Sequence, residues 1–524
     1  MVQRKKSMDG TARGFSRRDL LAAAGGMGLS FSLRGAAGAA GGRRILAPRG
    51  ARFKMVDELR IDLASEPDNL DPATTYDVDG WSIVHSVYDS LVEYGPSGEL
   101  RGLLARSLTQ IDPLTFEVKL RQGVSFHNGE PFTAESIALS HRKIVENKAS
   151  QIAGNFAPIT AVTTIDAQTV HLTLSKPAPW LPAQIAAWLA CLPPAYAAAN
   201  DILRAPVGTG PYRFVEWKAG ESITLEANPA YFAGSPKGSP LAKRVIYRFV
   251  GDPSTRVADL RSGAVNVIRS VPVDQRKDVE SGAATVIARP VSGCAWIRIP
   301  TDVAPFSDAK VRQAMNHAVD VDGIIKALLG GEGKRLANFF VENGLGYDPA
   351  LAPYAYDPEK AKALFKEAGL PSGFGTTLEF QADEHAPVVE AIAAQLTDAG
   401  MKTTPKAVEA ATFNQTWTDK GVAPLRFATW RPMFDPYTLL SLIVSKTGFI
   451  SRHDNPNAQP LIDSSSTETD ATKRAALLTQ LGKVLHDEPA AIYLWNLTAL
   501  YGVAKNTPAW SPRPDDYIIA TGKQ

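Results

Sequence analysis

Apolar residues recur along this chain with two different periods, and each period predicts one kind of element. At residues 59–63, 114–120 and 169–175 apolar and polar residues alternate, which predicts half-buried β-strands. At residues 311–318 apolar residues recur every three or four positions, which predicts a helix with one buried face. The same patterns predict further strands at 212–214, 223–225, 378–381 and 425–429, and further helices at 81–92, 357–368, 388–396 and 471–486.

The order of these elements predicts an α/β fold. Strands at 378–381 and 425–429 flank the helix at 388–396, and this strand–helix–strand order is typical of a partly parallel sheet. The run of Ser and Thr at 464–469 predicts a loop. About 480 residues follow an N-terminal leader, too many for one hydrophobic core, so we expect two or three domains.

Residues 1–40 predict an export signal and not a part of the fold. A basic stretch precedes the pair Arg17 and Arg18, a weakly apolar run follows at 20–33, and small residues around Ala39 offer a cleavage site. The arginine pair is typical of the twin-arginine type, so we expect export to the periplasm and cleavage near Ala39. The alternative is a basic tail followed by a short helix.

The charge balance changes once this leader is set apart. Residues 1–40 hold seven of the 56 Lys and Arg and two of the 54 Asp and Glu, which leaves 49 and 52, a formal charge of −3. The basic character therefore belongs to the leader. We expect no nucleic-acid partner and no binding to an anionic membrane surface.

Sequence motifs for catalysis are missing. The chain has no Gly-x-Ser-x-Gly elbow, no His-Glu-x-x-His and no phosphate-binding loop. Its eight histidines are scattered without pairs four residues apart, so we expect no metal site built from protein ligands and no cofactor. These patterns favour a protein that is not an enzyme; an exported hydrolase, the alternative, would need a nucleophile and base or a metal cluster.

Residues 120–137 (LRQGVSFHNGEPFTAESI) carry the most specific pattern of the chain. A strand ends at their start, turn residues follow at Gly123 and at 128–129, and Pro131 stops further pairing. Thr133 then offers a cap for a helix. We expect His127, inside this turn, to have a structural role.

Five segments in order resemble the family-5 extracytoplasmic solute-binding proteins, which serve ABC importers of peptides, nickel and related solutes. The segments are 120–137, 207–212 (VGTGPY), 227–232 (ANPAYF), 305–314 (PFSDAKVRQA) and 356–361 (YDPEKA). The resemblance implies a two-lobed periplasmic-binding-protein fold of cluster C type, with an extra subdomain inserted in the first lobe and a hinge-linked ligand cleft.

The same resemblance implies domain boundaries. The first lobe's sheet domain is expected from residues 55–75, 206–285 and 491–524, the extra subdomain from 76–205, and the second lobe from 286–490. Cys191 and Cys294 would then lie in different lobes, so we expect two buried free thiols.

Two loops hold the candidate ligand-binding residues. Tyr76 and Trp81 lie on the loop that leaves the first sheet, where relatives place ligand-facing side chains; the alternative for Trp81 is a helix residue packed in the core. The second loop follows the strand at 425–429, and open α/β sheets bind ligands at such strand ends. Its candidates are Trp430, Arg431, Phe434 and Asp435.

Each residue of the second loop suggests a different contact. In peptide binders a carboxylate of this region pairs with the ligand's α-amino group, and Asp435 is the acid available here; the alternative is an Asp-Pro turn without ligand contact. Phe434 replaces the Tyr of the Trp-x-x-x-Tyr-Asp-Pro pattern in nickel binders and lacks its hydroxyl. Arg431 could hold a carboxylate with two hydrogen bonds, or could pair with a nearby acid at the surface.

The sequence therefore predicts a periplasmic substrate-binding protein of an ABC importer. It would capture a peptide-like or other small organic solute, anionic or zwitterionic, by lobe closure and deliver it to the transmembrane permease subunits. We expect the protein to be a monomer. The alternatives are a periplasmic sensor or chaperone-like binding protein of the same fold, and a nickel-chelate binder.

Overall fold

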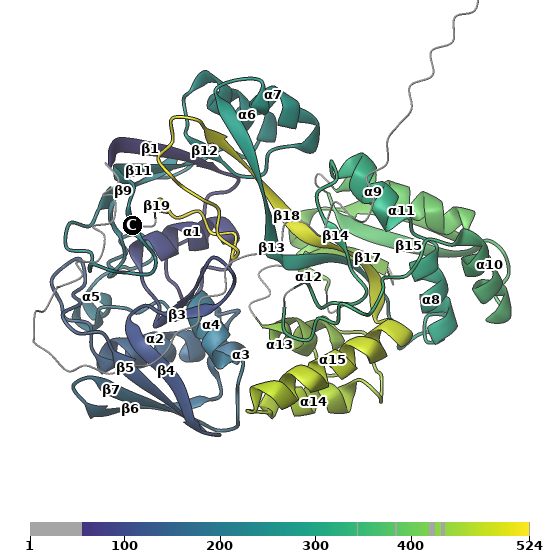
Figure 1. The fold of residues 1–524 in the computed structure, drawn as a ribbon, viewed down its shortest axis with the longest axis horizontal. Helices are drawn as coiled ribbons and strands as arrows, with labels where there is room; N and C mark the ends of the chain where they lie inside the picture. The colour runs from purple at the N-terminus through teal and green to yellow at the C-terminus, as the bar shows by residue number, and fades with distance from the viewer. Residues whose placement is uncertain are drawn as a thin grey trace, which may run out of the picture. The chain divides into compact units, whose positions relative to one another are not determined.

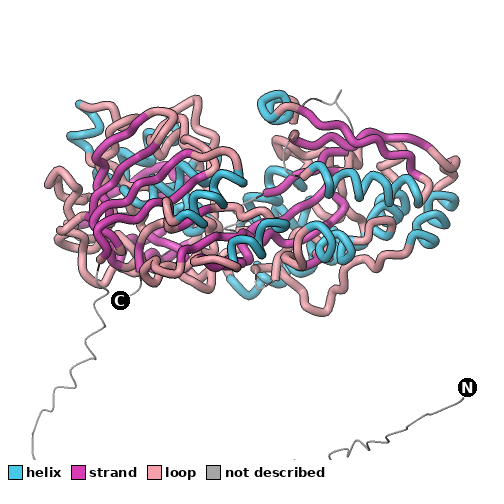
Figure 2. Tube along the Cα trace, turned by 90° about the horizontal axis from the view of Figure 1, so that it is seen from above, coloured by secondary structure: helices cyan, strands magenta, loops and turns pink. Residues whose placement is uncertain are grey.

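The computed structural model shows a mixed α/β arrangement of helices and strands (Figures 1 and 2). It describes residues 55–342, 344–382, 385–417, 419, 425–430 and 435–522. The predicted export signal lies outside these residues. No helix in the described part of the chain has both the length and the apolar character that crossing a membrane requires.

An 11-stranded sheet is the central element of the fold. Its strand order is β16-β15-β17-β13-β18-β12-β1-β11-β9-β8, and β14 also pairs with β18. The two long strands β13 (Ala284–Arg298) and β18 (Ala491–Ala504) are antiparallel and occupy its middle (Figure 1). We call the part built around β1 (residues 55–283 and 505–522) the first lobe, and the part around β15 (residues 299–490) the second lobe.

The first lobe combines one half of this sheet with a separate smaller sheet. In the large sheet, β1 pairs in parallel with β11, and β9 and β8 follow antiparallel. The smaller sheet has the order β4-β5-β7-β6 and lies within residues 76–205, where the extra subdomain is expected. One hydrophobic core joins both sheets through residues such as Ile61, Val87 and Val118. The predicted domain boundaries stay predictions.

The elements of the first lobe have the following bounds: β1 (Val56–Leu63), α1 (Val78–Val87), β2 (Val92–Tyr94), β3 (Leu100–Gly102), β4 (Ala105–Asp112), β5 (Thr115–Leu120), α2 (Ala134–Glu146), α3 (Ala153–Phe156), β6 (Ile159–Asp166), β7 (Thr169–Leu174), α4 (Leu181–Trp188), α5 (Pro194–Ala199), β8 (Tyr212–Lys218), β9 (Ser222–Ala227), β10 (Ser239–Pro240), β11 (Ala242–Phe249), α6 (Pro253–Ser262), β12 (Val267–Ile268), a 3-10 turn (Val273–Gln275), α7 (Arg276–Glu280) and β19 (Thr521–Gly522).

The second lobe confirms the predicted partly parallel sheet. Strand β15 pairs in parallel with β16 and with β17, and α11 connects β15 to β16 along the chain. The pattern of the sequence did not predict β16. The elements are α8 (Ala309–His317), α9 (Val321–Leu328), β14 (Lys334–Arg335), α10 (Pro358–Glu367), β15 (Phe374–Gln381), α11 (Ala386–Asp398), β16 (Met401–Val408), α12 (Ala410–Gln415), β17 (Leu425–Trp430), α13 (Pro436–Leu439), a π-helical turn (Leu440–Val444), α14 (Gln459–Thr467) and α15 (Ala471–Asp487).

The loop predicted at 464–469 is wrong for most of its length, because α14 continues to Thr467. The hydroxyls that made this run resemble a loop are satisfied inside the helix. Ser466 Oγ donates to the Asp463 carbonyl at 2.7 Å, and Thr467 Oγ1 donates to the same oxygen at 3.3 Å. Such bonds let Ser and Thr remain in a helix whose other face is buried.

The two cysteines agree with the prediction. Cys191 and Cys294 are both free and buried.

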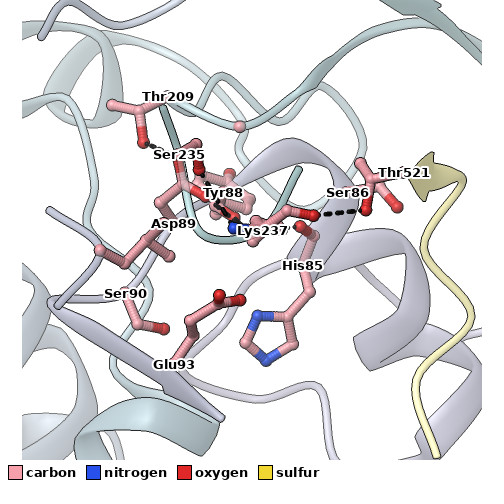
Figure 3. A network of polar contacts seen from close by, with 12 residues as sticks. His85, Ser86, Tyr88, Asp89, Ser90, Glu93, Thr209, Ser235, Lys237 and Thr521 are labelled. Carbon is pink, nitrogen blue, oxygen red and sulfur yellow. Dashed lines mark hydrogen bonds and ion pairs between the residues drawn. The ribbon is translucent and has the colours of Figure 1, made fainter. Parts of the chain in front are cut away.

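A buried ion pair holds the end of α1 to the turn before β10 (Figure 3). The Lys237 ammonium contacts the Asp89 carboxylate and donates to the carbonyls of His85 and Tyr88 at 2.8 and 2.9 Å. Thr209 Oγ1 donates to the second Asp89 oxygen at 3.0 Å. Both charged side chains are almost fully buried, and these bonds offset the cost of removing them from water.

The turn at 120–137 is fastened to a second family segment by His127. The Gly208 N–H donates to His127 Nδ1 at 3.3 Å, so Nε2 carries the proton and donates to the Gly210 carbonyl at 3.0 Å. Both glycines lie so close to the carbonyl of Val87, at the end of α1, that a Cβ atom would collide with it. The predicted structural role of His127 is confirmed by these contacts.

Burial lowers the pKa of His127 to about 4, well under its ordinary value. The folded protein therefore keeps this imidazole neutral, while the unfolded chain takes up a proton below about pH 6.5. The contribution of neutral His127 to the free energy of unfolding is fully present above about pH 6.5 and is lost as the pH falls toward about 4.

We expect His127→Gln to remove this pH-dependent part of the stability. The unfolding free energy of the wild type should fall relative to that of His127→Gln by up to about 3 kcal/mol between about pH 7 and about pH 4. Urea unfolding of both proteins at several pH values measures the difference. His453 is also buried with a lowered pKa and adds its own pH dependence to both proteins, so the informative quantity is the difference between their unfolding free energies. If this difference does not change with pH, the prediction is contradicted.

Candidate functional site

A cavity of about 710 Å³ lies at the end of β17. Eight of its fifteen bordering residues carry aromatic rings, so stacking on flat or apolar groups is the contact it offers most. The rings belong to Tyr76, Trp296, His385, Phe413, Trp417, Phe427, Trp430 and Phe449.

Strand pairing places the central rings. Trp296 on β13 pairs with Ala428 on β17, two residues before Trp430, which is the last residue of that strand. Trp417 follows α12 and stacks beside Trp296, with the ring centroids 6.4 Å apart and an angle of 23° between the planes. The wall is therefore built by residues that lie far apart in the sequence.

Two buried arginines contact the rings of this wall. Arg298 and Arg426 face each other on β13 and β17. Arg298 lies over the ring of Trp417 at 5.1 Å and donates to the Trp417 carbonyl at 2.9 Å, while Arg426 lies over Phe413 at 4.0 Å and donates to its carbonyl at 3.0 Å. Burial, followed by the neighbouring charge of Arg426, lowers the pKa of Arg298 to about 9. These arginines hold the rings in place by cation–π contacts and hydrogen bonds.

Both lobes border the cavity. Tyr76 and Gln151 come from the first lobe, and the other residues come from β13 and the second lobe. Tyr76 is 40% exposed and Phe449 is 71% exposed, so both rings have a free face that a bound molecule could cover. A molecule in this cavity could thus contact the two lobes at once.

Comparison with known proteins identifies the family of this chain. The family model described as "Bacterial extracellular solute-binding proteins, family 5 Middle" matches residues 99–451, more than half of the chain. The chain belongs to this family. It is 27% identical over 464 residues to the probable D,D-dipeptide-binding periplasmic protein DdpA of Escherichia coli, covering 84% of this chain and 88% of that protein. It is 31% identical over 360 residues to the glutathione-binding protein GsiB of Pectobacterium atrosepticum, covering 67% of this chain and 69% of that protein.

Solved structures confirm the predicted two-lobed fold of family-5 solute-binding proteins. The structure of the ABC transporter substrate-binding protein CtaP from Listeria monocytogenes superposes with a TM-score of 0.80 and 24% identity. The match covers 89% of this chain and 99% of that chain. At this identity the likeness concerns the fold.

The structure brings two of the six candidate residues of this solute-binding protein to the cavity. Tyr76 and Trp430 border it from opposite lobes. Arg431 and Phe434 lie outside the described residues. Neither Trp81 nor Asp435 is among the residues that border the cavity.

Trp81 occupies the core position that was the alternative in the sequence analysis. It is 1% exposed, and its indole N–H donates to the Thr75 carbonyl at 2.9 Å. Its ring stacks with Tyr517 at 6.4 Å. The helix α1 begins at Val78, three residues earlier than predicted, because Asp77 caps it by accepting from the Gly80 N–H at 2.6 Å.

Asp435 is engaged by another part of the second lobe. Arg474 donates to its two carboxylate oxygens at 2.8 and 2.7 Å, and one of these oxygens also accepts from the Tyr437 N–H at 2.9 Å. Asp435 is thus the N-cap of α13. This arrangement matches the turn-residue alternative, and the carboxylate already has a guanidinium partner.

Sequence reasoning missed most of the cavity wall. Phe413 and Trp417 are four residues apart, a spacing that could have indicated neighbouring rings on a helical segment. No local pattern marks Trp296 or Phe449, because their place depends on which strands and turns become neighbours. Within the described residues, no three His, Cys, Asp or Glu side chains lie where they could share a metal ion.

Proposed function

We propose that this protein is a periplasmic receptor that captures a small organic or peptide-like solute in the aromatic cavity and delivers it to an ABC importer. The observation that carries the proposal is the cavity itself, bordered by Tyr76 of one lobe and Trp430 at the end of β17 in the other. The names of relatives support it, since DdpA is described as a probable D,D-dipeptide-binding periplasmic protein and CtaP as an ABC transporter substrate-binding protein.

The contacts available at the cavity are sufficient for useful affinity. Micromolar binding requires about −8 kcal/mol, and stacking between aromatic faces contributes a large part of such energies. Within the described residues, the buried indole N–H groups of Trp296 and Trp430 meet no hydrogen-bond acceptor. Contact with both lobes favours the closed state, because only a difference in affinity between two states can shift their balance.

We expect Trp430→Ala and Tyr76→Ala each to weaken solute binding at least tenfold, since each removes a stacking face from one lobe. Mass spectrometry of the protein purified from periplasm under native conditions identifies the bound solute, and calorimetry with that solute measures the affinities. Trp217→Ala is the matched control, because Trp217 lies on β8 and does not border the cavity.

Two results would contradict the capture proposal. One is a protein that carries no solute from the periplasm and binds none when incubated with periplasmic extract. The other is turnover of peptide or ester substrates, which would favour an exported hydrolase.

The sequence of the second loop suggests the charge of the solute. We propose that Arg431 pairs with a carboxylate of an anionic or zwitterionic solute. Arg431→Ala should weaken binding of the identified solute about tenfold or more, whereas Arg431→Lys should keep part of the affinity because the charge remains. Calorimetry that gives equal affinities for wild type and Arg431→Ala would exclude this role.

We propose that the protein reaches the periplasm through the twin-arginine pathway. The support is the pair Arg17 and Arg18 between a basic stretch and a weakly apolar run. Replacing both by Lys keeps the charge and should abolish most export, as measured by the amount of protein released by osmotic shock. Replacing Lys5 and Lys6 by Arg is the control, and equal periplasmic amounts for both variants would contradict the proposal.

A further inference from the structure

The two lobes touch each other at a place outside the aromatic cavity. Trp180, the N-cap residue just before α4 in the first lobe, stacks on Tyr437 of α13 in the second lobe, with ring centroids 4.2 Å apart and planes 15° apart. The indole N–H of Trp180 donates to the Ser466 carbonyl of α14 at 3.2 Å. Trp180 is 2% exposed, because the core of the first lobe and the contacts with Tyr437 and Ser466 together cover its ring.

A second bond joins the same elements one helical turn further along α4. Gln184 Nε2 donates to Thr438 Oγ1 at 2.8 Å, and the Gln184 side chain is fully buried. This hydrogen bond gives the buried Nε2 group a partner and favours the arrangement in which the lobes touch, whereas Oε1 of Gln184 is buried without a hydrogen-bond partner among the described residues. Trp180 and Gln184 thus contact neighbouring residues, Tyr437 and Thr438, of one short helix.

Arg474 fixes the part of the second lobe that Trp180 and Gln184 contact. It donates to both carboxylate oxygens of Asp435, which caps α13, and to the Ser465 carbonyl of α14 at 2.9 Å. One guanidinium on α15 therefore fixes the two helices that Trp180 meets. Asp435, for which the sequence suggested ligand contact, instead pairs with Arg474, and this pair positions Tyr437 and Ser466.

The two residues that make this contact from the other side, Trp180 and Gln184, belong to the first lobe. Trp180 and the residues around it on α4 pack in the same hydrophobic core as β1 and α1. The chain crosses between the lobes along β13 and again along β18, and α4, α13 and α14 all lie outside these strands. A rotation of the lobes about β13 and β18 that separated α4 from α13 would break the stack and both hydrogen bonds.

We infer that Trp180 and Gln184 form an interlobe latch with Tyr437, Thr438 and Ser466, and that this latch sets the balance between closed and open states without contacting the solute. The inference rests on the proposed capture function, because the apparent affinity for the solute then scales with the fraction of molecules in the closed state. In the sequence, Trp430 of the cavity wall precedes Asp435, the N-cap of α13, by five residues. Trp180 and Gln184 are positioning residues.

The test measures lobe closure directly. Spin labels on cysteines placed at Thr163 on β6 and Gln480 on α15, both exposed, report the distance between the lobes by double electron–electron resonance. The native cysteines are buried and should not react. The variants are Thr438→Val, which keeps the shape and removes the acceptor of Gln184, and Trp180→Phe, which keeps a ring and removes the indole N–H.

Both latch variants should broaden the distance distribution toward longer distances. The ratio of closed to open molecules should fall about three- to tenfold, and the affinity for the solute identified by mass spectrometry should fall where the closed state had been dominant. Trp217→Phe is the matched control, because Trp217 donates to Glu66 within the first lobe. Equal unfolding midpoints for variant and wild type show that the change is in closure and not in folding.

The outcomes separate the latch from the capture function. Unchanged distance distributions in both variants would overturn the latch, whatever the solute affinity does. Changed distributions in a protein that binds no solute would support the latch while the capture function fails. Distributions that change only together with a lower unfolding midpoint would also overturn the latch, since general loss of structure then explains them.

Discussion

The pairing of β13 with β18 is the interaction on which the rest of the structure depends. These two strands carry one continuous sheet from the first lobe into the second, and every other strand of that sheet is added on one side or the other. Their register shifts around Cys294, where Asn496 Nδ2 donates to the carbonyls of Val291 and Gly293 at 2.9 and 2.8 Å. An irregular register leaves fewer ladder bonds at that point, so bending there costs less than elsewhere in the pair.

The buried charges of this protein act mainly by positioning other groups. Lys237 and Asp89 join the end of α1 to two loops, and Arg474 with Asp435 joins three helices of the second lobe. Arg298 and Arg426 support the aromatic wall of the cavity through their contacts with Trp417 and Phe413. Removing one partner of such a pair leaves a charge without compensation, which is why these contacts specify one arrangement of the surrounding elements.

The family segments and the candidate site have different roles in the fold. Residues 120–137 identify the family, yet none of the residues that border the cavity comes from them. Their turn is bonded through His127 to Gly208 and Gly210, which pack against the end of α1. Close backbone approach explains why these positions require glycine, and the segment stabilises the first lobe at a distance from the cavity.

The sequence by itself determined many of the local elements and the family. The strands at β5, β7 and β17 and the helices α8, α10, α11 and α15 follow from apolar periods, because each buries one face that its own residues define. Tyr76 could be chosen as a candidate by resemblance to relatives, and Trp430 because it lies at the end of a predicted strand. What only the tertiary structure decided is which side chains meet. Trp296, Trp417 and Phe449 share one cavity, Trp81 is enclosed in the core, and Asp435 is paired with Arg474, because these contacts depend on strand pairing and lobe packing over hundreds of residues and on no local pattern.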